Sequence, residues 1–192
     1  MENSYLTNPL VFLVQILFGT YTLMVMLRFV LQLVHADFYN PVSQFIVKVT
    51  TPVLRPLRRV IPGIGGMDVA SLVLIWLLKS IELALVILLS GMGVNLLAAL
   101  AWALPELVAL LINVFLFAIL IQVILSWVNP GAYNPVTGLI HSLTDPLLRP
   151  ARRLIPPISG LDLSPMLVMV LLVLLKMLLL PPLQILTGSP FR

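Results

Sequence analysis

Two groups of charged residues in this sequence could carry out chemistry. The first is a pair of arginine triplets, each beside regularly spaced apolar residues: Arg55, Arg58 and Arg59, and later Arg149, Arg152 and Arg153. Basic residues at a membrane surface attract anionic lipid headgroups by about 1 kcal/mol each. The triplets are therefore candidate binding sites for anionic phospholipid or for a protein partner.

The second group consists of ionisable residues inside or beside long apolar runs: Lys79, Glu82, Lys176 and Glu106. Lys79 and Glu82 are three residues apart, so on a helix they share a face and can pair. Lys176 has no acidic residue within reach in its own run, so its partner must come from another helix, with Glu82 or Glu106 as the candidates, or be water. Such residues either join helices or line a polar path for ions, and both interpretations stay open.

The triplets also have a simpler interpretation, in which they only orient the chain in a membrane. The surrounding prolines favour a specific contact instead, because they impose a backbone shape that orientation does not require. The repetition of the pattern points the same way, although a recent duplication would also preserve it.

The composition indicates that lipid is the main solvent of the chain. Of its 192 residues, 60% are hydrophobic and 9% are charged, whereas soluble domains carry about 25% charged residues. Cysteine is absent, which excludes disulfides and thiolate metal sites. The net charge of +4 is confined to a few places, which favours membrane topology over nucleic-acid binding.

Known catalytic patterns are missing from the sequence. It contains no Gly-rich phosphate loop, no zinc motif and no Gly-x-Ser-x-Gly. His35 and His141 occupy unmatched positions in the two copies described below, so neither is expected to be a ligand. Without paired acids, or a nucleophile with its base, we expect neither enzymatic activity nor a cofactor.

The arginine triplets belong to a duplicated unit. Residues 40–68 and 134–162 align without a gap at an offset of 94, with 16 identities in 29 positions. Four apolar runs are long enough to span a bilayer, which takes about 20 residues: 9–33, 69–90, 104–128 and 163–186. We expect an all-α membrane protein with four transmembrane helices, arranged as two parallel-oriented repeats over residues 9–90 and 104–186.

Prolines and polar residues refine this picture. Pro9, Pro105 and Pro165 are expected in first helical turns, whereas Pro181 and Pro182 should break or kink the fourth helix. Residues expected to form hydrogen bonds between helices are Gln15, Gln32, Asn113 and Gln122. Arg28 is expected to extend toward the membrane surface. Asp68 and Asp162 are expected to cap the helices that follow them.

Each duplicated segment, 40–62 and 134–156, reads as an amphipathic helix. After Asn40 as N-cap, an apolar stripe recurs at helical spacing: Val42, Phe45, Ile46 and Val49. Thr51-Pro52 and Asp145-Pro146 predict a second helix start within each segment. A helix lying in the headgroup layer, with its stripe toward the acyl chains, fits this pattern.

Orientation follows from the distribution of basic residues. The two segments between spans hold seven Lys and Arg residues, whereas the opposite side holds only Arg192. Basic residues favour the cytoplasmic side. We therefore expect both segments in the cytoplasm and both termini in the periplasm.

The duplicated motif resembles that of the bacterial YggT (YlmG) family. The resemblance is carried by Asn-Pro-Val, then (Thr/Asp)-Pro-x-Leu-Arg-Pro-x-Arg-Arg-x-Ile-Pro and Asp, and it covers about residues 9–186. It implies a bacterial inner-membrane protein tied to osmotic-stress tolerance and potassium uptake. Relatives in Gram-positive bacteria, cyanobacteria and plastids are tied to cell division, nucleoid or thylakoid organisation, and cytochrome b6f haem assembly. The family has no catalytic residues to carry over.

Two function classes follow. In the first, the chain is an ion-homeostasis component or part of a channel, with Lys79, Glu82 and Lys176 at a polar interface. Two lysines against one nearby acid disfavour a cation path through one monomer, so a homo-oligomeric pore stays open. In the second, it is a scaffold or assembly factor whose arginine segments bind anionic lipid or a partner membrane protein.

Overall fold

The structure, a computed structural model, describes residues 3–91, 93, 95–128, 131, 134–155 and 162–189. This part of the chain forms six helices: α1 (Asn3–Leu33), α2 (Pro41–Val60), α3 (Val69–Leu89), α4 (Leu96–Val128), α5 (Pro135–Leu154) and α6 (Ser164–Thr187). Within these ranges the only β-type pairing is an isolated bridge between Ile64 and Met67.

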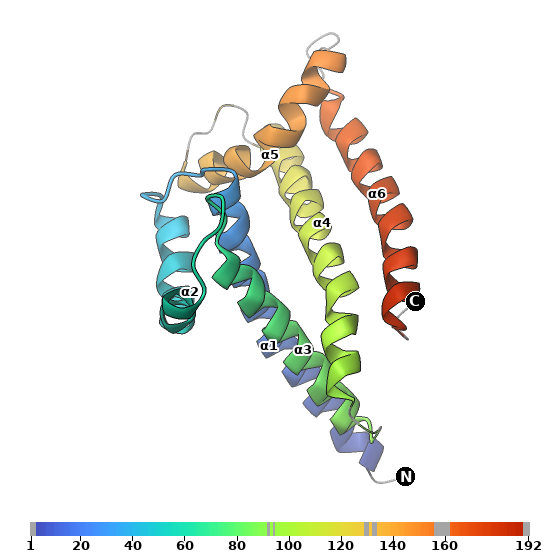
Figure 1. Cartoon of the computed structure of the whole chain (residues 1–192). Helices are drawn as coiled ribbons and strands as arrows, with labels where there is room; N and C mark the ends of the chain where they lie inside the picture. The colour runs from blue at the N-terminus through green and yellow to red at the C-terminus, as the bar shows by residue number, and fades with distance from the viewer. Residues whose placement is uncertain are drawn as a thin grey trace.

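Four of the helices, α1, α3, α4 and α6, are long and apolar enough to cross a membrane. Figure 1 shows α1 and α4 running toward the end of the molecule that carries α2 and α5, and α3 and α6 running back. The predicted all-helical fold, with four spans in two parallel repeats, is therefore confirmed.

Each repeat is built around a pair of antiparallel spans, α1 with α3 and α4 with α6, and the contact between α3 and α4 joins the halves. The largest core cluster combines both halves: Val25 and Val30 of α1, Leu54 of α2, Ile75 of α3, Val114 of α4, and Leu139 and Leu143 of α5. A second cluster, which includes Ile119, Leu148 and Leu172, belongs to the second half alone. The two halves therefore do not have equivalent surroundings.

The amphipathic segments are single helices, so the predicted second start at Thr51-Pro52 and Asp145-Pro146 is wrong. Each segment is one helix of 20 residues with two prolines inside it. A proline removes one backbone hydrogen bond and bends a helix without having to end it. Figure 1 shows α5 changing direction along its length. In α2 the hydroxyls of Thr50 and Thr51 donate to the carbonyls of Ile46 and Val47, at 2.7 and 2.5 Å.

Three predictions about prolines in the spans need correction. Pro9 and Pro105 lie inside α1 and α4, because these helices begin earlier, at Asn3 and Leu96. The stretch before Pro105 is rich in Leu and Ala, which are strong helix formers. Of the two outcomes predicted for Pro181 and Pro182, a break or a kink, the break does not occur, because α6 continues to Thr187 and is capped by Gly188 with φ 65°. Pro165 does lie in the first turn, as predicted.

The two amphipathic helices meet at their N-terminal ends. The side chains of Asn40 and Asn134 cap α2 and α5 by accepting from the backbone N–H of Val42 and Thr137, each at 2.9 Å. The Asn40 side-chain amide also donates to the carbonyl of Pro135 at 2.5 Å. Both duplicated segments therefore lie at the same end of the bundle.

Candidate functional site

The middle arginine of each triplet is bound to an aspartate ten residues later. Arg58 pairs with Asp68, which also accepts from the hydroxyl of Ser71. In the second copy Arg152 Nε lies 2.9 Å from Asp162 Oδ2. Each pair closes the connection between an amphipathic helix and the next span. These two arginines therefore have a structural partner within the chain.

The aspartates of these pairs also hold the first turns of the following helices. The side chain of Asp68 caps α3, as predicted, by accepting from the N–H of Ser71 at 3.4 Å. The cap residue of α6 is Leu163, but Asp162 accepts from the N–H of Ser164 at 2.9 Å. Asp162 therefore acts on the first turn without occupying the cap position.

Hydrogen bonds keep both carboxylates charged. Burial alone would raise the pKa of Asp68, but the hydrogen bonds from Arg58 and Ser71 outweigh it and lower the pKa below its ordinary value. The pKa of Asp162 is lowered in the same way, against burial, by hydrogen bonds from Ser164 and Arg152. Both ion pairs are therefore formed at neutral pH.

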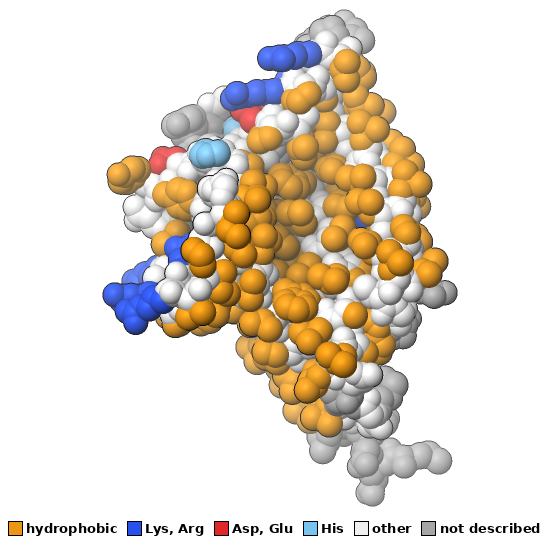
Figure 2. Space-filling model, viewed as in Figure 1, with side chains coloured by type: hydrophobic (Ala, Val, Ile, Leu, Met, Phe, Trp, Pro, Cys, Tyr) orange, Lys and Arg blue, Asp and Glu red, His pale blue; other side chains and the backbone are white. Residues whose placement is uncertain are grey.

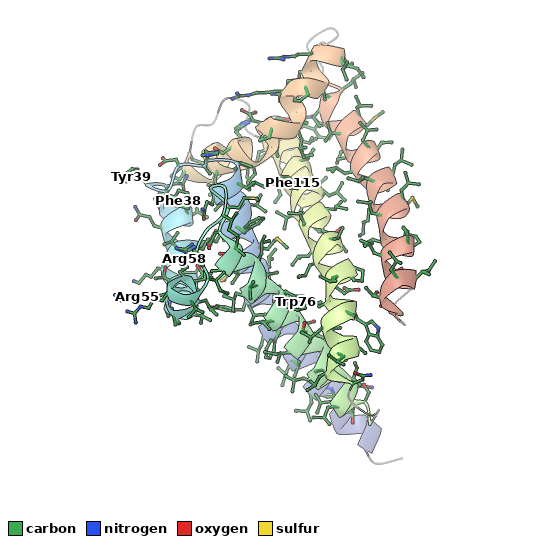
Figure 3. The ribbon with its side chains drawn as sticks, in the orientation of Figure 1. Phe38, Tyr39, Arg55, Arg58, Trp76 and Phe115 are labelled. Atoms are coloured by element: carbon green, nitrogen blue, oxygen red, sulfur yellow. The ribbon has the colours of Figure 1, made fainter. Side chains whose placement is uncertain are left out.

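The outer arginines differ between the two copies. Arg149 pairs with Asp145 at 2.8 Å, whereas the residue equivalent to Asp145 in the first copy is Thr51. Within the described residues, Arg55, Arg59 and Arg153 are exposed and have no ion pair. Figure 2 shows a dense group of basic side chains over α2, and Figure 3 shows Arg55 directed away from the bundle.

The side chains of α2 lie on three faces of the helix. One face packs into the core and contains Ser43, Ile46, Thr50 and Leu54. The second is a basic row of exposed residues: Lys48, Arg55 and Arg59. The third is an apolar row of exposed residues: Phe45, Val53 and Val60. The predicted single stripe is therefore divided, because Ile46 faces the core while Phe45 is 56% exposed.

The equivalent apolar row on α5 is largely covered. Leu139 and Leu143, which correspond to Phe45 and Val49, are only 7% and 3% exposed. Both belong to the core cluster that contains α1 and α3 of the first repeat. The exposed members of the row lie at its two ends, at Val136 and Leu154. One copy of the amphipathic helix therefore uses this face to join the two repeats.

Arg28 does not extend to the membrane surface, contrary to the prediction. It is buried, and its Nη1 donates to the hydroxyls of Thr50 and Thr51 at 2.7 and 2.9 Å and to the carbonyl of Val47 at 3.2 Å. These three acceptors lie just before Pro52, where α2 lacks a backbone donor. Arg28 thereby attaches the middle of α2 to α1.

The second repeat makes this attachment with a neutral side chain. Gln122 stands 94 residues after Arg28, and its Oε1 accepts from the hydroxyl of Thr144, the equivalent of Thr50. Its Nε2 lies 3.3 Å from Nδ1 of His141. The sequence contained one signal for this joint, the threonine shared by the two copies. The different partners, Arg and Gln, hid it.

The two lysines of the spans have separate partners. Lys79 Nζ lies 2.9 Å from Glu82 Oε1, as predicted. Lys176 binds Oδ1 of Asn113 at 2.9 Å. Its partner therefore comes from another helix, as predicted, but the prediction that it is Glu82 or Glu106 is wrong. The reason is the packing of α6 on α4, which places an amide opposite Lys176. Asn113 thus forms the predicted hydrogen bond between helices.

The two glutamates of the spans, Glu82 and Glu106, differ in their surroundings. Glu82 is buried, and its Oε2 has no hydrogen-bond partner among the described residues. Glu106 is half-buried, and in the same part of the chain it forms no ion pair. Glu82 and Lys176 occupy equivalent positions at the offset of 94, so the two repeats carry opposite charges there.

A polar pocket of about 390 Å³ lies beside the first ion pair. It is lined by Gln32, Arg58, Ile61, Gly63, Gly66, Met67 and Asp68. Gln32 donates to the carbonyl of Gly66 at 3.4 Å, and Gly66 has φ 82°, a value that favours glycine. In the described part of the chain, no cluster of three or more His, Cys, Asp or Glu side chains could hold a metal.

Comparison with known proteins shows the family. The CCB3/YggT family model matches twice, over residues 7–89 and 101–183, again at an offset of 94. An uncharacterized protein of Pseudomonas aeruginosa is 48% identical over 187 residues, which cover 96% of this chain and 95% of the relative. The uncharacterized protein YggT of Escherichia coli K12 is 41% identical over 172 residues, 88% of each chain. No solved structure matches the chain. On this evidence, the chain is a member of the CCB3/YggT family with two tandem copies of the family unit.

Proposed function

We propose that this chain is a non-enzymatic inner-membrane scaffold that binds anionic phospholipid through the exposed basic residues of its Arg-Pro segments. The main support is the arrangement on α2, where exposed arginines without an acidic partner in the described part lie next to exposed apolar residues. Such a helix matches the boundary between headgroups and acyl chains. Each basic residue near an anionic surface contributes about 1 kcal/mol to this binding.

The lipid-binding test should spare Arg58 and Arg152, whose ion pairs join each amphipathic helix to the next span. Replacing Arg55, Arg59, Arg149 and Arg153 by Gln removes four exposed charges and leaves Arg58–Asp68 and Arg152–Asp162 in place. The purified variant should retain far less phosphatidylglycerol than the wild type in a native mass spectrum, while phosphatidylcholine is unchanged. A variant that retains as much phosphatidylglycerol as the wild type would contradict the proposal.

The same proposal includes an orientation, with α2 and α5 in the cytoplasm and both termini in the periplasm. Its support is the excess of basic residues in these segments. Because the chain has no cysteine, Arg55→Cys and Arg149→Cys provide unique labels. A membrane-impermeant maleimide should label neither in intact spheroplasts and both after lysis. Labelling of one before lysis would refute the orientation.

A second candidate function is a role in ion homeostasis, such as potassium uptake under osmotic stress. The observation that favours it is the buried Glu82 Oε2, which lacks a hydrogen-bond partner in the described part of the chain. A buried polar atom without a hydrogen bond destabilises the fold, so its presence calls for an explanation such as a functional role. If Glu82 lines an ion path, Glu82→Gln should change potassium flux into liposomes that contain the purified chain. Equal flux in the variant, or none in the wild type, would dismiss this role.

A further inference from the structure

We propose that the two Arg-Pro segments have different tasks: α2 is the anionic-lipid site, and α5 is a seal between the repeats. This inference rests on the proposed function and assigns its lipid site to one repeat. The two helices have the same length, and each contains two prolines. Their exposed faces and their charges distinguish them.

The first distinction is the apolar row. On α2 it is open at Phe45, Val53 and Val60, which are 56%, 42% and 80% exposed. On α5 the residues equivalent to Phe45 and Val49, Leu139 and Leu143, are buried against the first repeat. Apolar side chains that already pack in the core are not available for acyl chains. The middle of the row is therefore open on α2 and covered on α5, where the exposed members are Val136 and Leu154 at the two ends.

The second distinction is the free charge. Helix α2 carries four basic residues and no acid. Among the described residues only Arg58 has an acidic partner, so Lys48, Arg55 and Arg59 are uncompensated there. Helix α5 carries three arginines, of which Arg149 pairs with Asp145 and Arg152 with Asp162. One uncompensated arginine, Arg153, is left. Three charges against one favour α2 at an anionic surface.

The third observation concerns the entry to α2. Phe38 and Tyr39 lie directly before the helix and are exposed, and Figure 3 shows both at the outer edge of the molecule. Aromatic side chains at such positions are typical of the membrane–water boundary. Lys48, Arg55 and Arg59 follow along one face over about 16 Å. Charge and apolar surface on the same helix indicate a phospholipid bilayer as the ligand, since a soluble phosphate would use only the charge.

A matched pair of double variants tests this assignment. Arg55→Gln/Arg59→Gln and Arg149→Gln/Arg153→Gln remove the same number of charges at equivalent positions of the two repeats. The purified full-length chain in detergent is titrated with phosphatidylglycerol and followed by native mass spectrometry. We expect about 30-fold weaker binding for the α2 variant and less than about threefold for the α5 variant. Added glycerol phosphate should not compete.

Two outcomes would overturn the inference, and they differ in what else they imply. Equal weakening by both variants would refute the division of tasks but leave the lipid scaffold intact. Unchanged binding in both would refute the inference together with the proposed function. The arginines replaced are exposed, so both variants should fold, and an unchanged Tm in detergent verifies this.

An independent measurement tests the apolar row. Phe45→Cys introduces a unique thiol, because the chain contains no cysteine, and a bimane attached there reports contact with lipid. In vesicles, phosphatidylglycerol with brominated acyl chains should quench this bimane at least twofold more than brominated phosphatidylcholine. A label at Val60 should respond in the same way. Equal quenching by the two lipids at both positions would show that anionic lipid is not selected at α2.

Discussion

The helices α2 and α5 show how a duplicated sequence can acquire two roles. Both begin at an Asn cap, both contain two prolines, and both are tied to the next span by an Arg–Asp pair. Their backbones follow the shared motif, but their outer faces meet different neighbours. Leu139 and Leu143 of α5 pack on the first repeat, whereas Phe45 of α2, the equivalent of Leu139, is 56% exposed. Two segments of similar sequence therefore become inequivalent, because their positions in the tandem repeat give them different neighbours.

The joints beneath these helices differ in the same sense. In the first repeat Arg28 donates to three oxygen atoms of α2. In the second, Gln122 bonds the hydroxyl of Thr144 and lies close to His141. Burying a charged guanidinium that has no carboxylate at contact distance costs more free energy than burying a neutral amide. The first joint therefore depends more strongly on its full set of acceptors.

The largest expected effect comes from the apolar row. Leu139→Ala should lower the free energy of unfolding by about 2–5 kcal/mol, because it empties a buried position in the core shared by the repeats. Phe45→Ala, at the equivalent exposed position, should change it by less than about 0.5 kcal/mol. Thermal and denaturant unfolding in detergent measure both. Similar losses of unfolding free energy in the two variants would show that the apolar faces of α2 and α5 do not differ in burial.

The next largest effects on stability are expected at the contacts that attach α2 and α5 to the spans, made by Arg28 and Gln122. Arg28→Ala leaves the hydroxyl of Thr50 without its charged donor, and a hydrogen bond to a charged group contributes about 1.5–3 kcal/mol. Gln122→Ala removes neutral hydrogen bonds, for which we expect about 1 kcal/mol. The same unfolding measurements apply. A larger loss for Gln122→Ala would reverse the proposed ranking of the two joints.

The two Arg–Asp pairs should contribute differently to stability, because their aspartates are buried to different extents. The side chain of Asp68 is 7% exposed and that of Asp162 is 31% exposed. Asp68→Asn should therefore cost about 1–3 kcal/mol of stability, and Asp162→Asn less than about 1 kcal/mol. Hydrogen exchange of the first turns of α3 and α6 would locate each effect. Equal costs would show that burial does not separate the two pairs.

Acid should act through the same carboxylates. Since the folded-state pKa of Asp68 lies below its ordinary value, which is about 3.9 in the unfolded chain, its contribution to stability is present above about pH 4. That contribution is lost as the pH falls through the folded-state pKa. Wild type should lose Tm on acidification below pH 4, and Asp68→Asn should lose less. Parallel Tm curves would exclude Asp68 as the source of acid sensitivity.

The smallest effect is expected from a substitution that makes the free charge of α5 more similar to that of α2. Asp145→Thr gives α5 the residue that α2 has at this position and frees Arg149. Exposed ion pairs contribute little, so stability should change by less than about 0.5 kcal/mol. Phosphatidylglycerol binding should rise by less than about threefold, because α5 is assigned to the contact between the repeats and not to lipid. A larger rise would show that α5 also binds anionic lipid.

Some features of the fold could be predicted from local pattern alone. The apolar runs predicted the four spans, because a bilayer sets both their length and their composition. The caps at Asn40 and Asp68 were predictable, since each interacts with residues only two or three positions away. The start of α4 was not, because residues before Pro105 can join a helix that contains a proline.

The amino-acid sequence by itself determined the family, the two repeats, the spans and the basic character of both Arg-Pro segments. Only the tertiary structure decided which apolar residues are covered, that Arg28 attaches α2, and that Lys176 binds Asn113. The physical reason is that these outcomes depend on which helices pack together. Hydrophobic periodicity shows that a face is apolar, but the neighbouring helix decides whether that face meets protein or lipid.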